Sequence, residues 1–81
     1  MIIVWDEPKR QANLVEHGID IADMGAEFFL SVLVIPAMDG RFAAIGEMHG
    51  TITVIFAVVG TEGVSLIFAR PASITKPSLL P

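Results

Sequence analysis

Three polar residues near the N-terminus are spaced so that they can act together. Lys9, Asn13 and His17 recur at four-residue intervals, which places an amine, an amide and an imidazole on one face of a helix. An ammonium group binds phosphate, and an imidazole serves as a general acid or base near neutral pH. The row is therefore either a ridge that faces a ligand or, as spacing alone favours, an ordinary solvated helix face.

Two arginines further along the chain extend this chemistry. Arg41 follows an Asp-Gly turn, and Arg70 ends the last expected strand. The planar guanidinium group donates two parallel hydrogen bonds to an oxyanion, so both residues suit phosphate if the fold brings them near the first helix. The alternative, which sequence alone favours, is a surface ion pair for each arginine. His17 also has a structural alternative, in which its imidazole stabilises a helix C-terminus.

The chain shows no pattern for a bound metal or cofactor. The absence of cysteine excludes disulfides and thiolate metal sites. His17, Glu47 and His49 lack the spacing of a metal site, and neither a nucleotide-binding glycine loop nor a Gly-x-Ser-x-Gly motif occurs. We therefore predict no metal and no cofactor.

Length and composition limit the class of protein. The 81 residues suffice for one domain, expected over 1–70, followed by an irregular tail over 71–81 with three of the five prolines. Apolar residues make up 53% of the chain, but no apolar run approaches the roughly 20 residues that span a bilayer. We therefore expect no membrane segment, and with no signal peptide recognised the expected location is the cytoplasm. The net charge of −4 disfavours broad attraction to nucleic acid, so that any such contact would be local.

The sequence predicts an α+β fold that positions these residues. A β-branched and aromatic start predicts a short strand over 1–5, and Asp6 and Gly18 mark the two ends of a first helix. Asp20 begins a second helix over 19–30. Four strands then follow, over 32–38, 42–48, 51–59 and 64–69. Because short turns join them, they should form a mostly antiparallel sheet with the helices on one face.

Several side chains are expected to take particular places in the packing. Trp5 should fill the core where the first strand meets the helix, with stacking on a nucleic-acid base as the alternative. Leu14 and Ala12 should face inward from the first helix. Gly25 should allow a close approach within the second helix, and Pro36 should lie on an edge strand because it cannot donate to a ladder.

Several short motifs occur in a characteristic order over roughly residues 2 to 73. They are Trp5-Asp6, Lys9, Asn13, His17-Gly18-Ile19, Asp39 with Arg41 and Gly46, Thr61-Glu62-Gly63, and Ala69-Arg70 with Ala72-Ser73. Taken together, these motifs resemble the BrnT family of toxins from bacterial type II toxin-antitoxin systems. No single motif carries the resemblance by itself.

The resemblance implies a function and a set of site residues. It implies a fold like that of the RelE ribonuclease toxins, RNA cleavage in the cytoplasm, inhibition of translation, and neutralisation by a BrnA-type antitoxin that also binds operator DNA. A homodimer and a heterotetramer are both compatible with such a system. By position, the catalytic candidates are His17, Arg41 and Arg70, and the candidates for RNA or phosphate binding are Lys9, Asn13 and Trp5.

The C-terminal segment departs from the family pattern and keeps a second function open. Family members commonly continue from Ala-Arg-Arg-Ala into a charged helix of the type Glu-Arg-x-x-Tyr. This chain instead has Pro71 at the second arginine position and then Lys76, Pro77 and Leu80, so that helix is expected to be lost or irregular. The chain is therefore either a metal-independent endoribonuclease or a catalytically weak or inactive module with the toxin fold. The second kind of protein would act through protein-protein association at its apolar strands.

Overall fold

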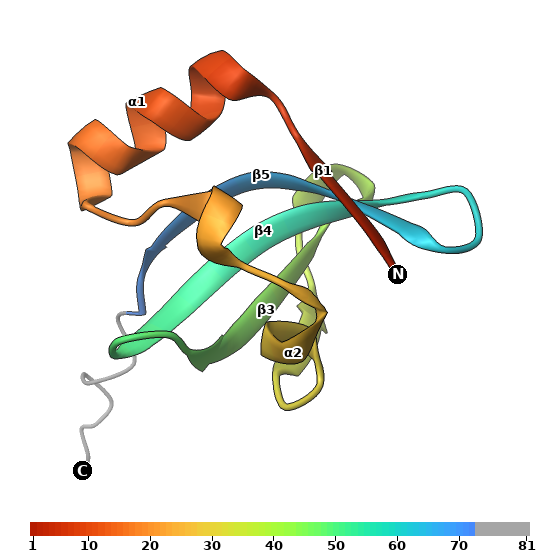
Figure 1. Cartoon of the computed structure of the whole chain (residues 1–81). Helices are drawn as coiled ribbons and strands as arrows, with labels where there is room; N and C mark the ends of the chain where they lie inside the picture. The colour runs from red at the N-terminus through yellow and green to blue at the C-terminus, as the bar shows by residue number, and fades with distance from the viewer. Residues whose placement is uncertain (73–81) are drawn as a thin grey trace, which may run out of the picture.

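A five-stranded sheet organises the computed structural model, which describes residues 1–72 (Figure 1). Its strands are β1 (Ile2–Trp5), β2 (Leu33–Pro36), β3 (Phe42–Glu47), β4 (Thr51–Val59) and β5 (Gly63–Pro71). Helix α1 (Glu7–His17), the 3-10 turn η1 (Ile21–Asp23) and the short helix α2 (Ala26–Phe29) lie between β1 and β2, and the turn η2 (Met38–Gly40) precedes β3. The α+β class is confirmed. The expected irregular tail falls outside the described residues from 73 onward.

The strand order is β1-β5-β4-β3-β2, with one parallel pair. Strands β2 to β5 pair antiparallel in sequence order, because their connections are too short for a crossover. In the β4–β5 turn Gly60 has φ +63°, a left-handed conformation that glycine adopts without a steric penalty. Strand β1 pairs in parallel with β5 and forms one edge of the sheet. Strand β2 forms the other edge and contains Pro36, as predicted.

Helix α1 begins and ends where the sequence predicts. The Asp6 carboxylate accepts a hydrogen bond from the backbone N–H of Lys9 at 3.2 Å, and Pro8 lies in the first turn. Gly18 ends the helix with φ +71°, and its N–H donates to the Leu14 carbonyl at 2.8 Å. The local signals therefore determine both ends of the element that carries the polar row.

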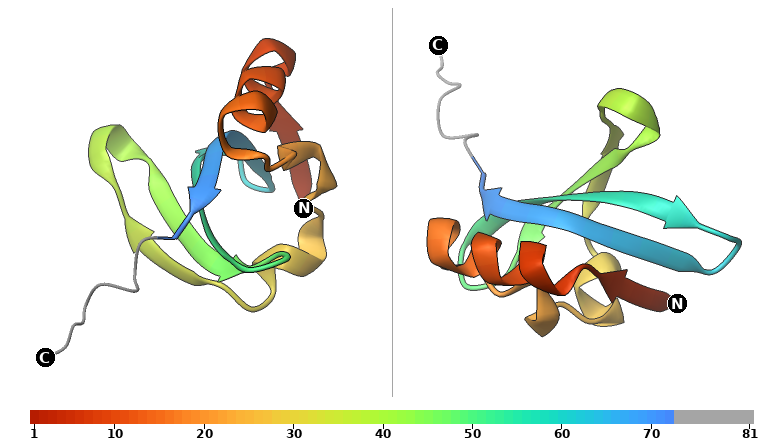
Figure 2. Two further views of the ribbon diagram at one scale, coloured as in Figure 1. Left: turned by 90° about the vertical axis from the view of Figure 1, so that its left-hand side faces the viewer. Right: turned by 90° about the horizontal axis from the view of Figure 1, so that it is seen from above.

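Helix α1 lies along the edge of β5 rather than over a face of the sheet. Strand β1 covers the first half of that edge, and α1 follows β1 beside the second half (Figure 2, right). A helix in this place buries only a narrow strip, and Asn13 is its one buried residue. Leu14 is 40% exposed and Ala12 is also exposed, so the prediction that both face inward is wrong. Trp5, at the end of an edge strand, is 37% exposed and does not fill the core.

The predicted second helix over 19–30 is broken into two short pieces. Asp20 caps η1 as expected, since its carboxylate accepts from the backbone N–H of Ala22 at 3.0 Å. Met24 and Gly25 are then extended, and α2 begins only at Ala26. The extended break lets Met24 enter the core, where it is 4% exposed. Gly25 has open space around it, so it does not serve the close approach that we predicted.

The core lies between one face of β3, β4 and β5 and the segment that holds η1 and α2. Its buried members are apolar residues from both layers: Ile21, Met24, Ala44, Ile52, Val54, Phe56, Val64, Leu66 and Ala69. Gly46 of β3 belongs to this packing, because a Cβ there would lie 2.7 Å from the Val32 side chain and 3.2 Å from the Phe28 ring. The close approach that was expected at Gly25 therefore occurs at Gly46.

Candidate functional site

Lys9 and His17 line an open groove between α1 and the second half of β5. The groove has a volume of about 390 Å³, and Ile67 and Phe68 contribute its β5 side. Because the two polar residues are eight positions apart, they are separated by about 12 Å along the helix axis. The outer members of the predicted row thus border one groove, with an apolar strand opposite them.

The middle member of the row, Asn13, is used by the fold. Its side-chain Nδ2 donates to the Ile19 carbonyl at 2.9 Å, and its Oδ1 accepts from the backbone N–H of Ala69 at 3.0 Å. The residue is only 4% exposed. Buried amides of this kind satisfy backbone groups that would otherwise lack a partner. Both polar ends of the Asn13 side chain are thus bonded to the backbone, which favours a structural role over the predicted binding of RNA or phosphate.

His17 lies in the last turn of α1, where two pockets meet. Its side chain is 28% exposed, and its Nε2 is 3.9 Å from a carboxylate oxygen of Glu16. His17 also lines a second pocket, together with His49 of the β3–β4 turn. His49 has φ +55°, a left-handed conformation that is uncommon for residues other than glycine. The spacing of His17 and His49 in the sequence does not predict that both line one pocket.

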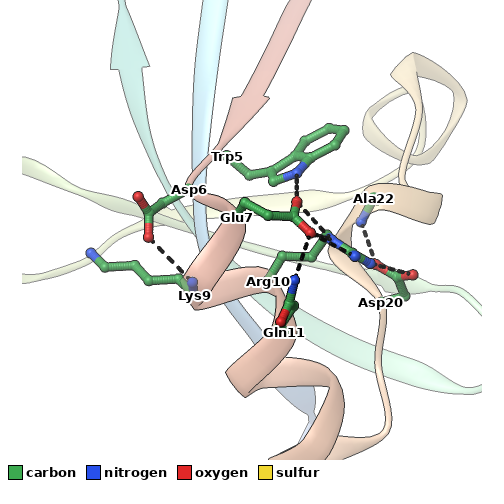
Figure 3. Close-up of polar contacts among 8 residues, drawn as sticks. All are labelled: Trp5, Asp6, Glu7, Lys9, Arg10, Gln11, Asp20 and Ala22. Carbon is green, nitrogen blue, oxygen red and sulfur yellow. Dashed lines mark hydrogen bonds and ion pairs between the residues drawn. The ribbon is translucent and has the colours of Figure 1, made fainter.

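Arg10, which the sequence left unassigned, is the centre of an ion-pair network on the other side of α1 (Figure 3). Its Nη2 is 2.7 Å from the carboxylate of Glu7, and its Nη1 is 2.9 Å from the carboxylate of Asp20. Glu7 also accepts from the Gln11 amide at 3.2 Å and from the Trp5 indole at 3.3 Å. The three-residue spacing of Glu7 and Arg10 is enough to predict their ion pair from the sequence. The bond from Arg10 to Asp20 is not predictable in this way, because it depends on how the chain turns after α1.

These contacts shift the pKa values of the charged groups. Hydrogen bonds from Arg10, and then from Gln11, lower the pKa of Glu7 from 4.5 to about 2. Hydrogen bonds from Arg10 and from the backbone of Ala22 lower the pKa of Asp20, and the pKa of Arg10 is raised by its bonds to Glu7 and Asp20. Arg10 is thus committed to two carboxylates and is not a free cation for a ligand.

Three other cations form no ion pair within residues 1–72: Lys9, Arg41 and Arg70. For Arg41 and Arg70, the expected alternative was a surface pair with a carboxylate. No such pair is found in the described part of the chain, so these side chains keep their charge available for an anion. Of the basic groups on α1, Lys9 rather than Arg10 is the one that can serve a ligand.

The two arginines lie at different places relative to the groove. Side chains alternate along a strand, so Arg70 is on the same face of β5 as Phe68, which lines the groove. Arg41 comes directly before Phe42 of β3. Phe42 pairs with Phe56 of β4, which in turn pairs with Leu66 of β5, and Leu66 comes four positions before Arg70. That offset is about 13 Å along the strand. Neither arginine is among the residues that line the groove, and Arg70 is the nearer of the two, because it follows the groove residue Phe68 by two positions on β5.

Trp5 does not line this groove either. Its indole donates to Glu7 within the Arg10 network, on the side of α1 that faces η1 (Figure 3). Within residues 1–72 no group of three or more His, Asp or Glu side chains is placed to hold a metal ion. The helices of that same region include none with the length and hydropathy that crossing a membrane requires.

The fold and the groove define a class of protein. It is a small α+β domain in which a helix presents an amine and an imidazole beside a strand whose last residues include an arginine that forms no ion pair within residues 1–72. These are the groups that bind a phosphodiester and move its protons.

The comparisons with known proteins name the family. A family model described as "Ribonuclease toxin, BrnT, of type II toxin-antitoxin system" matches residues 5–75. The crystal structure of the Brucella abortus ribonuclease toxin BrnT is similar to this chain with 52% identity and a TM-score of 0.84, and the match covers 90% of this chain and 97% of that one. A comparison with curated protein sequences found no match. The chain belongs to the BrnT family of ribonuclease toxins of type II toxin-antitoxin systems.

Proposed function

We propose that this BrnT-family toxin is a metal-independent RNA endonuclease that acts in the cytoplasm and inhibits translation. The observation that carries the proposal is the groove that Lys9 and His17 line on α1, together with Arg70, which lies two residues after the groove residue Phe68 on the same face of β5. Membership of a family of ribonuclease toxins supports RNA as the ligand of this groove. We further propose that the antitoxin partner expected of a type II toxin is a BrnA-type protein, through which alone operator DNA is bound.

The chemistry needs two proton transfers and a charge-stabilising group. A base takes the proton of the ribose 2′-hydroxyl, the 2′-oxygen attacks phosphorus, and the 5′-oxygen leaves with a proton from an acid. The products are a 2′,3′-cyclic phosphate and a 5′-hydroxyl. We assign one proton transfer to His17, phosphate binding to Lys9, and stabilisation of the pentavalent phosphorane to Arg70. Arg41 and Trp5 lie outside the groove, and we propose that they contact RNA beyond the cleaved bond.

Substitutions on the two walls of the groove test this assignment. We expect His17→Ala to lower the cleavage rate by about 10² to 10⁴-fold, because it removes a proton-transfer group. Arg70→Ala should lower it by about 10² to 10³-fold through lost charge stabilisation. The measurement is cleavage of a synthetic RNA by the purified protein, in the presence of a chelator.

Val15→Ala is the matched control for these variants. Val15 is on α1 and is 88% exposed, so its truncation should leave the rate unchanged. If folded wild-type protein leaves the RNA intact, or if the His17 and Arg70 variants cleave as fast as wild type, the enzymatic proposal is wrong for this chain.

A second candidate function rests on the exposed apolar residues around β2. Leu30, Leu33 and Met38 are 84%, 63% and 81% exposed, and they lie on or beside an edge strand with a free row of backbone groups. These features favour a module that acts through association, as a homodimer or a heterotetramer. Light scattering of the purified protein, alone and with the product of the neighbouring gene, tests it, and a strictly monomeric protein without affinity for that product would exclude it.

A further inference from the structure

Asn13 occupies the centre of the groove-lining row without being committed to a ligand. Lys9 lies one turn before it and His17 one turn after it, and all three border the groove. Its neighbours in the row are exposed or half-buried, whereas Asn13 is buried. A polar side chain at such a place requires a partner, because a buried amide without a hydrogen bond loses the hydration that it has in the unfolded chain.

The partner groups of Asn13 belong to two separate parts of the chain. Strand β1 covers the edge of β5 only as far as Leu66, so the N–H of Ala69 lies at a part of the edge that no strand covers. The Asn13 Oδ1 accepts from that N–H at 3.0 Å, and its Nδ2 donates to Ile19 at 2.9 Å. One amide therefore replaces a missing strand neighbour and ties the middle of α1 to β5.

The remaining attachment of α1 is at a different place. Arg10 connects the first half of the helix to Asp20, which caps η1. Because this ion pair does not involve β5, it holds α1 to the body of the protein without determining the width of the groove. The bond from Asn13 to Ala69 is the side-chain hydrogen bond that joins α1 directly to β5 among the described residues.

We infer that Asn13 is a positioning residue of the ribonuclease site, an inference that rests on the proposed function. Its amide sets the spacing between α1 and β5, and thereby places His17 and Lys9 relative to a phosphodiester that lies in the groove. Asn13 itself touches none of the reacting atoms. Without the amide, α1 stays attached through Arg10 but shifts along the free edge of β5. Misplacement of a catalytic group by about 1 Å costs on the order of 10²-fold in rate.

A double-mutant cycle separates positioning from a general loss of structure. We expect Asn13→Ser to lower kcat for RNA cleavage by about 10 to 100-fold with a smaller change in KM, because misplacement acts on the proton transfer. In the His17→Ala background the same substitution should change the rate by less than about 3-fold, because the group that it positions is already absent. The effect of Asn13→Ser on KM is compared in the same way with and without Lys9→Ala, which tests whether Asn13 also positions the phosphate-binding amine.

A matched variant and a second substitution guard against misfolding. Gln11→Ala removes an exposed amide of the same helix, which bonds only to Glu7, and should cleave RNA as wild type does. If Asn13→Ser does not fold, Asn13→Asp retains the acceptor for Ala69 but replaces the donor to Ile19 with a buried carboxylate, so its rate loss relative to wild type should shrink as the pH falls and the carboxyl gains a proton to donate. Amide hydrogen exchange should be faster at Ala69 in Asn13→Ser, with the neighbouring β4–β5 pairs unchanged.

The outcomes distinguish this inference from the proposed function. Equal rate losses in the wild-type and His17→Ala backgrounds would reduce Asn13 to a residue of general stability, and wild-type kcat in a folded Asn13→Ser protein would overturn the inference while leaving the ribonuclease intact. If wild-type protein itself cleaves no RNA, the proposed function fails first and the inference fails with it.

Discussion

At the scale of single residues, similar side chains on one short helix take different roles according to which side of the helix they occupy. Lys9 and Arg10 are adjacent cations, yet Lys9 borders the groove without an ion pair in the described structure, whereas Arg10 is held by two carboxylates. Asn13 and Gln11 are both amides, and only Asn13 is buried against β5. The chemistry available to a ligand is therefore smaller than the composition of α1 suggests.

The Arg10 network should make the stability of the protein sensitive to acid. Glu7 has a pKa of about 2 in the folded protein against 4.5, and the pKa of Asp20 is lowered as well. Carboxyls whose pKa is lower in the folded than in the unfolded state stabilise the fold above the unfolded pKa, and that stability is lost as pH falls toward the folded pKa. We expect the free energy of unfolding to decrease between pH 4.5 and about 2.

Substituting the shared cation isolates this effect. Arg10→Met keeps an unbranched apolar stem but removes the guanidinium group, and it should flatten the dependence of unfolding on pH in that window, as measured by urea denaturation at a series of pH values. Arg41→Met is the control, because Arg41 forms no ion pair within residues 1–72, and it should keep the wild-type profile. An Arg10→Met protein with an unchanged profile would show that the network does not contribute in solution.

At the scale of elements, the site depends on an edge that is covered by two different elements. Strand β1 pairs with the first part of β5, and α1 takes over where β1 ends (Figure 2, right). A helix rather than a strand therefore lies beside the last part of β5. The groove exists because a helix covers a strand edge less completely than another strand would.

The packing of α2 against β3 predicts a sharp difference between two glycines. In Gly46→Ala the new methyl group would meet Val32 at 2.7 Å, so we expect a loss of about 1–3 kcal/mol in the free energy of unfolding. Gly25→Ala is the matched control, because the space around it is open, and its effect should stay within about 0.5 kcal/mol. Thermal and urea unfolding of both variants provides the measurement, and equal effects would contradict the packing described here.

At the scale of the whole molecule, the protein and its proposed RNA substrate both carry negative charge. The net charge of −4 offers no general attraction, so the proposed RNA binding would rest on local cations such as Lys9, Arg41 and Arg70, which form no ion pair within residues 1–72. The two edges of the sheet also differ in their chemistry. The edge at β5 carries the groove of Lys9 and His17, while the edge at β2 carries exposed apolar residues, so the proposed catalysis and the proposed association would use separate surfaces.

The small number of cations predicts a weak salt dependence. If Lys9, Arg41 and Arg70 each contact one phosphate, the logarithm of the RNA binding constant should fall with the logarithm of salt concentration at a slope of about −2. Fluorescence anisotropy with an oligonucleotide that lacks the 2′-hydroxyl at the cleavage site measures this without turnover. A slope several times steeper would mean that a larger basic surface exists than the described residues provide.

The features that the sequence determined by itself are those that depend on residues close together in the chain. Asp6 and Gly18 end α1 as predicted because capping acts within one turn. The spacing of Lys9 and His17 predicted one row for the same reason, and the order of the motifs predicted the family that the comparisons confirm.

The remaining features were decided by tertiary structure, since each depends on groups that meet across the fold. The hydrogen bond between Asn13 and Ala69 joins residues 56 positions apart. The break in the predicted second helix at Met24 follows from the burial of Met24 in the core. Trp5 and Leu14 are exposed because β1 and α1 lie at an edge of the sheet. Spacing along the chain contains no signal for which strand edge a helix will cover. The edge of β5 gives Asn13 its place in the fold, and the turn after α1 brings Asp20 to Arg10, so tertiary contacts leave Lys9 and His17 as the polar residues of α1 that face the groove.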